Sequence, residues 1–214
     1  REEKLHILEK KGIAPFPSKA ERSHTIAQAL MVEEKKTVTV VGRILTKREM
    51  GKLTFCHIQD DTGKIQLVFN KATLDEDSFT TFAKLVDSAD IISAHGERFA
   101  THKGEPSVLV TSWTLLTKTL RPLPDKFHGL QDEELRLRKR YLDLFLHPEL
   151  RDLFRRKAMF WQSMRLFLLQ EGFLEVETPV LETTTGGADA KPFVTHHDAL
   201  DVPVYLRISN GELW

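Results

Sequence analysis

The stretch TVTVVGRILTKREMGKLTFCHIQDDTGKIQLVFN, residues 37–70, decides the fold of the first part of the chain. Its apolar and polar residues alternate over three runs, residues 37–50, 52–60 and 64–70, and a period of two is typical of strands with one buried face. Gly51 separates the first two runs, and the residues DDTG (60–63) supply a turn between the second and third. The stretch therefore predicts three consecutive strands joined by turns.

The residues that follow continue the pattern of a small barrel. Residues 74–87 carry Phe79 and Phe82 at the spacing of one buried helix face, and residues 91–101 and 106–117 are typical of two further strands. Three strands, a helix and two strands is the order of an OB-fold, a five-stranded barrel whose exposed strands often bind oligonucleotides. Small barrels of other kinds share this order, and the order alone leaves them open.

Helical patterns lie on both sides of the predicted barrel. Residues 2–11 and 25–33 predict two short helices before it, and residues 132–146 and 148–170 predict two longer helices after it. Gly172 stands at a natural end for the last helix. We therefore predict an α+β protein in four parts: an N-terminal helical extension (1–36), the OB-fold barrel (37–118), a linker (119–131) and a second domain (132–214).

The composition restricts the class of protein only loosely. The chain has 214 residues, and 31 basic residues balance 31 acidic ones, so the net charge gives no case for nucleic-acid binding, although it can hide local clusters. The single cysteine, Cys56, excludes an internal disulfide and a cysteine-rich metal site, which fits a reducing cytosol. No apolar run approaches membrane-spanning length, so we expect a cytoplasmic protein without a membrane partner. Because the chain starts at Arg1, we expect that its natural N-terminus has been removed.

One face of the second and third strands has the residue types of a nucleobase site. A four-residue turn pairs His57 with Gln66, so that Phe55, His57, Gln66 and Val68 share a face. An exposed phenylalanine stacks on bases, and a glutamine amide can donate to and accept from a base edge. The alternative is that Phe55 belongs to the core and the nearby cations are merely solvated. Those cations, which could contact phosphates, are Arg43, Lys47, Arg48 and Lys52.

Two later stretches point to a known family. They are FHGLQDEELRLRKRYLDL (127–144) and GFLEVETPVLETTTGGADAKPFVTHHDALDVPVYLRIS (172–209), of which GFLEVETP predicts a strand that ends at Pro179. Together they resemble the class II lysyl-tRNA synthetases, and the segment with Pro179 stands where that class has its first signature motif. The resemblance covers nearly all of the chain. It implies that residues 132–214 are the first part of an antiparallel class II catalytic domain.

The resemblance also implies a role for the face described above. Related class II synthetases read the central uridine of the anticodon with the pattern R-x-x-G-x-x-x-F followed by a glutamine in the next strand. Arg48, Gly51, Phe55 and Gln66 match this pattern in order and spacing. The resemblance therefore implies that Phe55 and Gln66 read a uridine, with Arg48 and Arg43 also at the anticodon site.

Further family positions fall in the second part of the chain. In lysyl-tRNA synthetases, the second glycine of GGA lies against the bound lysine, and Gly187 matches it. Ser209 matches a pocket position that is usually alanine, and Glu212 corresponds to an acidic residue that binds the α-amino group. This chain reads R-I-S-N-G-E where the family has R-I-A-P-E, so Glu212 is one residue out of register. Pro179 and the helix before it match the dimer interface, although a purely structural proline would explain Pro179 equally well.

The sequence offers no other chemistry. His196, His197 and Asp198 are adjacent, and neighbouring side chains on an extended segment point to opposite faces, so we expect no metal site. The arginine-bearing second and third class II motifs would lie beyond Trp214. We therefore expect no catalytic residue in this chain, no ATP or Mg²⁺ bound by it, and no activity from it alone.

The resemblance implies a lysine–tRNA ligase. Such an enzyme activates L-lysine with ATP and Mg²⁺, transfers it to a lysine-accepting tRNA, and is a homodimer. An aspartyl- or asparaginyl-tRNA synthetase relative would share the barrel, although the stretches GGADAKPF (186–193) and RYLDL (140–144) favour lysine. A non-catalytic tRNA-binding or dimerisation module is a third interpretation.

Overall fold

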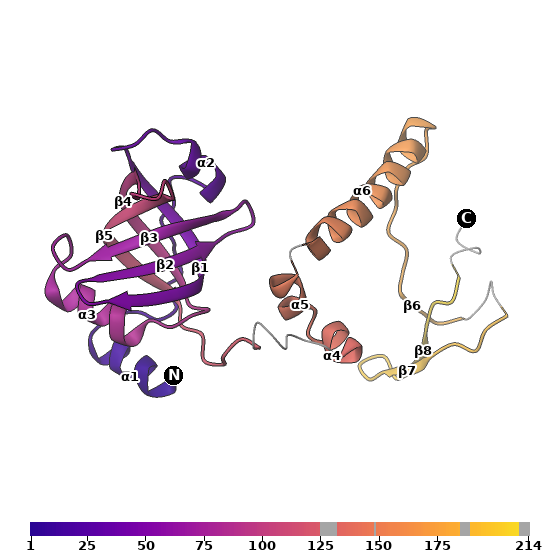
Figure 1. The fold of residues 1–214 in the computed structure, drawn as a ribbon. Coiled ribbons are helices and arrows are strands. Elements are labelled where there is room, and N and C mark those ends of the chain that lie inside the picture. Colours follow the sequence, from indigo (N-terminus) through magenta and orange to yellow (C-terminus); the bar gives the residue numbers. More distant parts are fainter. Residues whose placement is uncertain (125–131, 148, 185–188, 210–214) are drawn as a thin grey trace. The chain divides into compact units, whose positions relative to one another are not determined.

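The computed structural model describes residues 1–124, 132–147, 149–184 and 189–209. The chain divides into two compact units, residues 1–133 and 134–214, which are described separately (Figure 1).

The first unit is built on a closed five-stranded barrel with the strand order β1-β2-β3-β5-β4. β3 and β5 run parallel, and every other neighbouring pair is antiparallel. The helix α3 connects β3 to β4. This arrangement confirms the predicted OB-fold. The elements are β1 (Thr37–Met50), β2 (Leu53–Gln59), β3 (Lys64–Asn70), α3 (Glu76–Leu85), β4 (Ile91–Ala100) and β5 (Pro106–Thr117).

The long strand β1 closes the barrel by pairing with two neighbours. Its first half, Thr37–Arg43, pairs with β4, and its second half, Arg43–Met50, pairs with β2. Between Ile44 and Thr46 the register with β2 shifts by one residue. Such a bulge bends the strand and changes which residues face outward beyond it.

The barrel interior is filled by the alternating apolar residues of its strands, and the helices extend this core. The Phe69 ring in β3 stacks on Phe82 of α3 at a centroid distance of 3.6 Å, and Trp113 of β5 contacts Phe82 edge-on. The N-terminal helices α1 (Glu2–Lys10) and α2 (Ile26–Met31) join the same core through Leu8 and Ile26, both of which are buried.

A group of buried charges stabilises the region where α3 and β5 end. The Lys118 ammonium group is fully buried and lies 2.7 Å from Asp90 Oδ2 and 2.6 Å from Asp87 Oδ2. It also donates to the Leu85 carbonyl. Lys4 of α1 binds the other oxygen of Asp87 at 2.6 Å. A buried charge is tolerated only when it is paired in this way.

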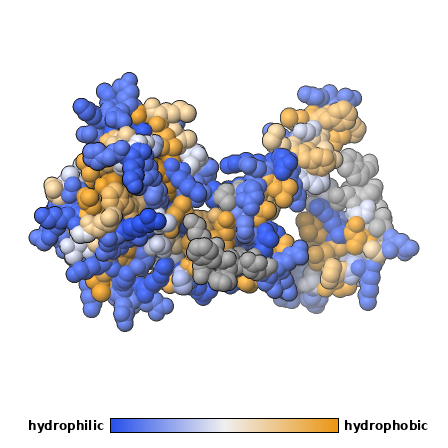
Figure 2. Space-filling model, viewed as in Figure 1, coloured by the Kyte–Doolittle hydropathy of each residue, from blue (hydrophilic) through white to orange (hydrophobic). Residues whose placement is uncertain are grey.

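Within its described residues, the second unit contains three helices and a small sheet. The helices are α4 (Glu133–Arg138), α5 (Arg140–Leu146) and α6 (Glu149–Gln170), and the sheet has the order β6-β8-β7, with β6 (Leu181–Glu182), β7 (Val194–His197) and β8 (Val202–Leu206). Large apolar side chains of α6 are exposed, among them Phe160, Trp161 and Phe167, and Figure 2 shows apolar residues gathered over this helix.

Two predictions for this unit are wrong in detail. The single helix predicted over residues 132–146 is broken at Lys139, where φ is −110° and ψ is 48°. The break lets Arg136 and Arg140 bind the same buried carboxylate of Asp143, at 2.9 and 2.6 Å. The strand predicted over residues 172–179 does not form, and pairing begins only at Leu181. Pro179 has no N–H to donate to a strand partner.

No helix within the described ranges is long and apolar enough to cross a membrane.

Candidate nucleic-acid interface

The outer face of β2 and β3 brings the predicted base-reading residues together. Phe55 pairs with Val68, and His57 pairs with Gln66, which confirms the predicted register. Along β2 the residues alternate between buried and half-buried, and Phe55 is half-buried on the outer face, whereas its neighbour Cys56 lies in the core. The alternative interpretation of Phe55 as a core residue is therefore wrong.

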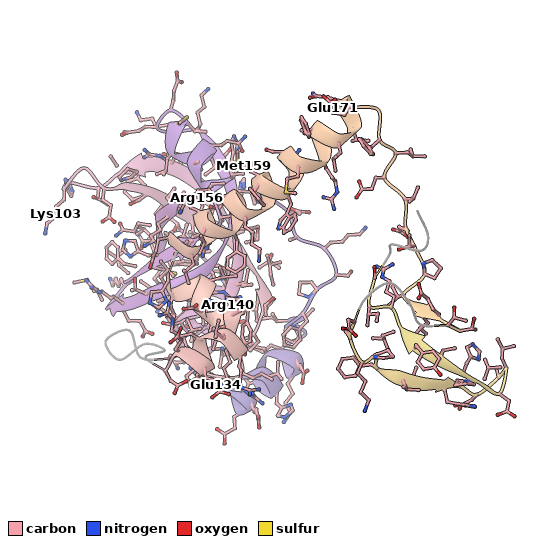
Figure 3. All side chains as sticks on the ribbon, turned by 90° about the vertical axis from the view of Figure 1, so that its right-hand side faces the viewer. Lys103, Glu134, Arg140, Arg156, Met159 and Glu171 are labelled. Carbon is pink, nitrogen blue, oxygen red and sulfur yellow. The ribbon has the colours of Figure 1, made fainter. Side chains whose placement is uncertain are left out.

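A groove of about 700 Å³ lies over this face. Phe55, Gln66 and Val68 line it from β2 and β3, and Phe99 lines it from β4. The β4–β5 loop forms another wall, with Lys103 projecting at its tip (Figure 3). An apolar groove with two aromatic side chains and a polar amide has the composition of a stacking site for an unpaired base.

Polar side chains at the edge of the groove form a continuous hydrogen-bonded chain. Glu105, in the β4–β5 loop, accepts a hydrogen bond from Gln66 Nε2 at 2.9 Å, and its other oxygen lies 2.8 Å from His57 Nε2. His57 Nδ1 lies 3.1 Å from the Thr46 hydroxyl of β1. The Ser107 hydroxyl of β5 donates to Gln66 Oε1 at 2.9 Å. Glu105 of the loop and Ser107 of β5 thus hold the Gln66 side chain directly, and Glu105 is in turn linked through His57 of β2 to Thr46 of β1.

The β1–β2 hairpin places a cation opposite the phenylalanine. Arg48 pairs with Phe55 in register and is exposed. The turn between Met50 and Leu53 has two residues, and Gly51 adopts a φ of +63°, which glycine accepts without strain. The spacing of Arg48, Gly51 and Phe55 in the sequence is therefore the spacing of a tight hairpin.

The four predicted cations have different surroundings. Lys47 points to the other face of β1, pairs with Cys56, and donates to the carbonyls of Phe82, Ala83 and Val86 at the end of α3. Burial lowers the pKa of the Lys47 ammonium group. Lys47 therefore holds α3 and is not available to a phosphate, so the expectation for this residue is wrong.

Arg43 stands on the outer face, but in register with Gln59, four residues along β2 from Phe55. Its guanidinium donates to the Ala89 carbonyl at 2.9 Å, and burial lowers its pKa, against the opposing effect of Asp90. Lys52 is exposed in the hairpin turn. Arg48 is thus the cation that the pairing places directly opposite Phe55.

Glu105 is the residue of this site that the sequence analysis missed. It lies 39 residues after Gln66, and only the parallel pairing of β3 with β5 brings it near. No motif marks a carboxylate at this place in the sequence. The turn residues at 103–104 show that a loop is there, without showing which strand it faces.

In the second unit, Arg207 connects β8 to the segment with Pro179. Its guanidinium donates to the Thr178 side chain, to the Thr178 carbonyl at 2.7 Å and to the Pro179 carbonyl at 3.0 Å. Pro179 itself is exposed, and Ser209 is half-buried two residues after Arg207. Gly187 and Glu212 lie outside the described residues.

The two adjacent histidines of β7 have different partners. His196 lies 3.3 Å from both Asp198 and Asp201, whereas His197 accepts a hydrogen bond from the Leu200 N–H. Within the described ranges, no group of three or more histidine, cysteine, aspartate or glutamate side chains is arranged to hold a metal ion.

Comparison with known proteins gives two domain matches that fit this geometry. Residues 38–116 match the model of the OB-fold nucleic acid binding domain, and residues 132–213 match that of the class II tRNA synthetases (D, K and N). A barrel with a base-sized groove, followed by the beginning of a synthetase domain, is thus the organisation of a class II tRNA synthetase.

Curated relatives narrow the class further. The chain is 49% identical over 212 residues to a lysine–tRNA ligase of Carboxydothermus hydrogenoformans, covering 98% of this chain and 43% of the relative. It is 46% identical over 217 residues to that of Synechococcus sp. and 44% identical over 219 residues to that of Bacillus subtilis, each match covering 98% of this chain and 44% of the relative. The chain belongs to the class II lysyl-tRNA synthetase family, and it spans less than half the length of these relatives.

Proposed function

We propose that the chain is part of a cytoplasmic lysine–tRNA ligase, and that its barrel binds the anticodon of a lysine-accepting tRNA. The names of the relatives support the amino acid, and the match to a nucleic-acid-binding OB-fold supports the tRNA. The single observation that carries the anticodon assignment is the placement of Phe55 and Gln66 in one groove with Arg48 beside them.

In this proposal the groove receives the central base of the anticodon. The base stacks on Phe55, and its Watson–Crick edge meets the amide of Gln66. Arg48 lies on the adjacent strand where a phosphate of the same nucleotide would pass. Arg43 takes part as a more distant cation. Its guanidinium must release the Ala89 carbonyl before it can bind a phosphate of the RNA.

The test is the binding of an anticodon stem–loop RNA at fixed salt. Phe55→Ala removes the stacking platform and is expected to weaken binding by about 1–3 kcal/mol. Phe16→Ala, which changes an exposed phenylalanine of the N-terminal segment, is the matched control and should leave affinity unchanged. Equal affinities for RNAs with a central uridine and a central purine would refute the assignment.

The second unit supplies the first part of the lysine site and of a subunit interface in this proposal. Gly187, Ser209 and Glu212 are assigned to L-lysine on the family pattern, and Pro179 and α6 to the contact with a second copy of the chain. The exposed apolar side chains of α6 support the interface. ATP and Mg²⁺ belong to the reaction of the whole enzyme, and none of the described residues is assigned to them.

A further inference from the structure

The Ala89 carbonyl joins strand β1 to the start of the linker. It accepts one hydrogen bond from Arg43 Nη1 at 2.9 Å and another from the Thr119 hydroxyl at 2.7 Å. Arg43 stands on the outer face of β1, whereas Thr119 follows the end of β5 and begins the linker. Two segments that are far apart in the sequence therefore share one acceptor.

The orientation of this carbonyl is fixed. Ala89 has a φ of +78°, a conformation that residues other than glycine rarely adopt. Its N–H donates to the Ile44 carbonyl at 2.8 Å, and the next N–H, that of Asp90, donates to the Asp87 carbonyl at 3.2 Å. Turning the Ala89 carbonyl toward other donors would break these bonds.

The Ala89 carbonyl is also buried, so its hydrogen-bond partners are important. Ala89 has no exposed surface. A carbonyl oxygen has two lone pairs, so it can bind both donors at once and stay paired when one of them leaves. A buried carbonyl that has lost every donor is strongly disfavoured. Arg43 can therefore leave readily for an RNA phosphate only while Thr119 remains.

Other contacts keep Thr119 in place. Its N–H donates to Asp90 Oδ1 at 2.8 Å, and its carbonyl accepts from the Arg1 guanidinium at 3.0 Å. The preceding residue, Lys118, is fully buried and pairs with the same Asp90 carboxylate. The Thr119 hydroxyl thus belongs to a segment that is fixed independently of Arg43.

We propose that Thr119 is a positioning residue for RNA binding: by sharing the Ala89 carbonyl it allows Arg43 to move to a phosphate, and it couples the start of the linker to the RNA site of the barrel. The inference rests on the proposed function, in which Arg43 takes part as a more distant cation. Such a coupling is reciprocal. Bound RNA should therefore hold Thr119 more tightly, because Thr119 then keeps the carbonyl paired.

Thr119→Val tests the proposal, because valine has the shape of threonine but no hydroxyl. The measurement is the dissociation constant of an anticodon stem–loop RNA with a central uridine for the 214-residue chain. We expect binding to weaken by about 5-fold, since Arg43 would now leave a buried carbonyl unpaired. The loss should not exceed that in Arg43→Met, where the cation itself is removed. If Arg43→Met binds as tightly as the unchanged chain, the proposal is wrong.

The salt dependence of binding distinguishes this role from a purely structural one. A phosphate contact to a single strand contributes about 0.7 to the slope of log affinity against log salt concentration. Because Arg43 stays on the carbonyl in Thr119→Val, the slope should fall by about this amount although the replaced residue is uncharged. Arg43→Met should lower the slope equally, and adding Thr119→Val to Arg43→Met should change it no further. An unchanged slope in Thr119→Val would overturn the proposal, even if the affinity falls.

Two further variants are controls for the hydroxyl. Thr119→Ser keeps it and should retain both the affinity and the slope. Thr117→Val makes the same change at the end of β5, where the side chain does not bind the Ala89 carbonyl, and should also leave both unchanged. If Phe55→Ala does not weaken binding, the proposed function itself fails. If Phe55→Ala weakens binding but Thr119→Val alters neither quantity, the coupling alone is refuted.

Hydrogen exchange of the unchanged chain covers the case in which Thr119→Val is poorly folded. Saturating RNA should slow exchange of the Thr119 amide, which is bound to Asp90 Oδ1. The amide of Gly12, bound to the Glu9 carbonyl at the end of α1, should exchange at the same rate with and without RNA. A Thr119 amide that exchanges equally fast in free and RNA-bound protein would contradict the coupling.

Discussion

Lys47 and Arg48 are adjacent residues with different tasks, and the bulge in β1 explains why. Before the bulge, the outward residues of β1 are odd-numbered, as for Val41 and Arg43. After the shift between Ile44 and Thr46, the outward residues are even-numbered, so Arg48 faces Phe55 and Lys47 faces α3. Strict alternation from residue 37 would give the reverse assignment. A single extra residue therefore decides which of the two cations can meet a phosphate.

Cys56 permits a test of burial at the scale of one residue. Its thiol is fully buried in the barrel core, and burial raises its pKa to about 12. Because the thiolate is the reactive form, the folded barrel should protect Cys56 from iodoacetamide at neutral pH. We expect alkylation only through opening of the barrel, at a rate that rises with urea in step with unfolding. Rapid labelling without urea would contradict the buried position.

At the scale of elements, the strands of the barrel could be predicted from the sequence and the details of the second unit could not. The bounds predicted for β1, β3 and β5 match the structure to the residue, because runs rich in β-branched and aromatic residues between turn residues mark where these strands begin and end. The break between α4 and α5 depends on the buried carboxylate of Asp143, which gathers Arg136, Arg140 and His147. These partners lie within seven residues of Asp143, but the spacing of apolar residues carries no signal of such charge pairing.

The candidate site shows the same division. Phe55 and Gln66 could be placed together because they lie in neighbouring strands joined by a short turn. Glu105 could not, because its position depends on β5 returning beside β3 after a helix and another strand.

The exposed apolar surface of α6 leads to a prediction about this helix. Phe160, Trp161 and Phe167 are each more than half exposed, at 60%, 52% and 61%. Because exposed apolar patches of this kind mark interfaces, we expect the 214-residue chain to self-associate. Sedimentation at increasing protein concentration should show species larger than the monomer, and Phe160→Glu should shift the distribution toward monomer. The matched change Phe16→Glu, outside α6, should not. A monomer at all concentrations would contradict the proposed interface.

At the scale of the whole molecule, each unit contains its own carboxylate held by cations, half-buried Asp87 in the barrel unit and buried Asp143 in the second unit. In the barrel unit, burial alone would raise the pKa of Asp87, but bonds from Lys118 and Lys4 outweigh it, and the pKa is lowered. In the second unit, bonds from Arg136 and His147 likewise outweigh burial and lower the pKa of Asp143. Both units should therefore lose stability in acid, each through separate groups.

The sign of this pH dependence follows from the direction of the shifts. A carboxyl whose pKa is lower in the folded state binds fewer protons there than in the unfolded chain. Its contribution is fully present above the ordinary aspartate value of about 3.9 and is lost as the pH falls through the folded value. Unfolding in urea should therefore require less denaturant at pH 3 than at pH 5 or above.

Lys118→Met isolates the contribution of the barrel unit. The substitution leaves Asp90 fully buried without its cation, and breaking a buried pair in this way typically costs about 3–5 kcal/mol. Because Cys56 is the single cysteine and lies in the barrel, its alkylation rate reports opening of this unit alone. We expect the rate at neutral pH to rise by about two to four orders of magnitude, which is the same free energy expressed as a ratio.

Lys84→Met, on the exposed side of α3, is the control and should change stability by no more than about 0.5 kcal/mol. The acid sensitivity of the barrel should shrink in Lys118→Met, because Asp87 loses the cation that lowers its pKa most. An unchanged labelling rate would mean that the Lys118 pair adds nothing to the stability of the barrel.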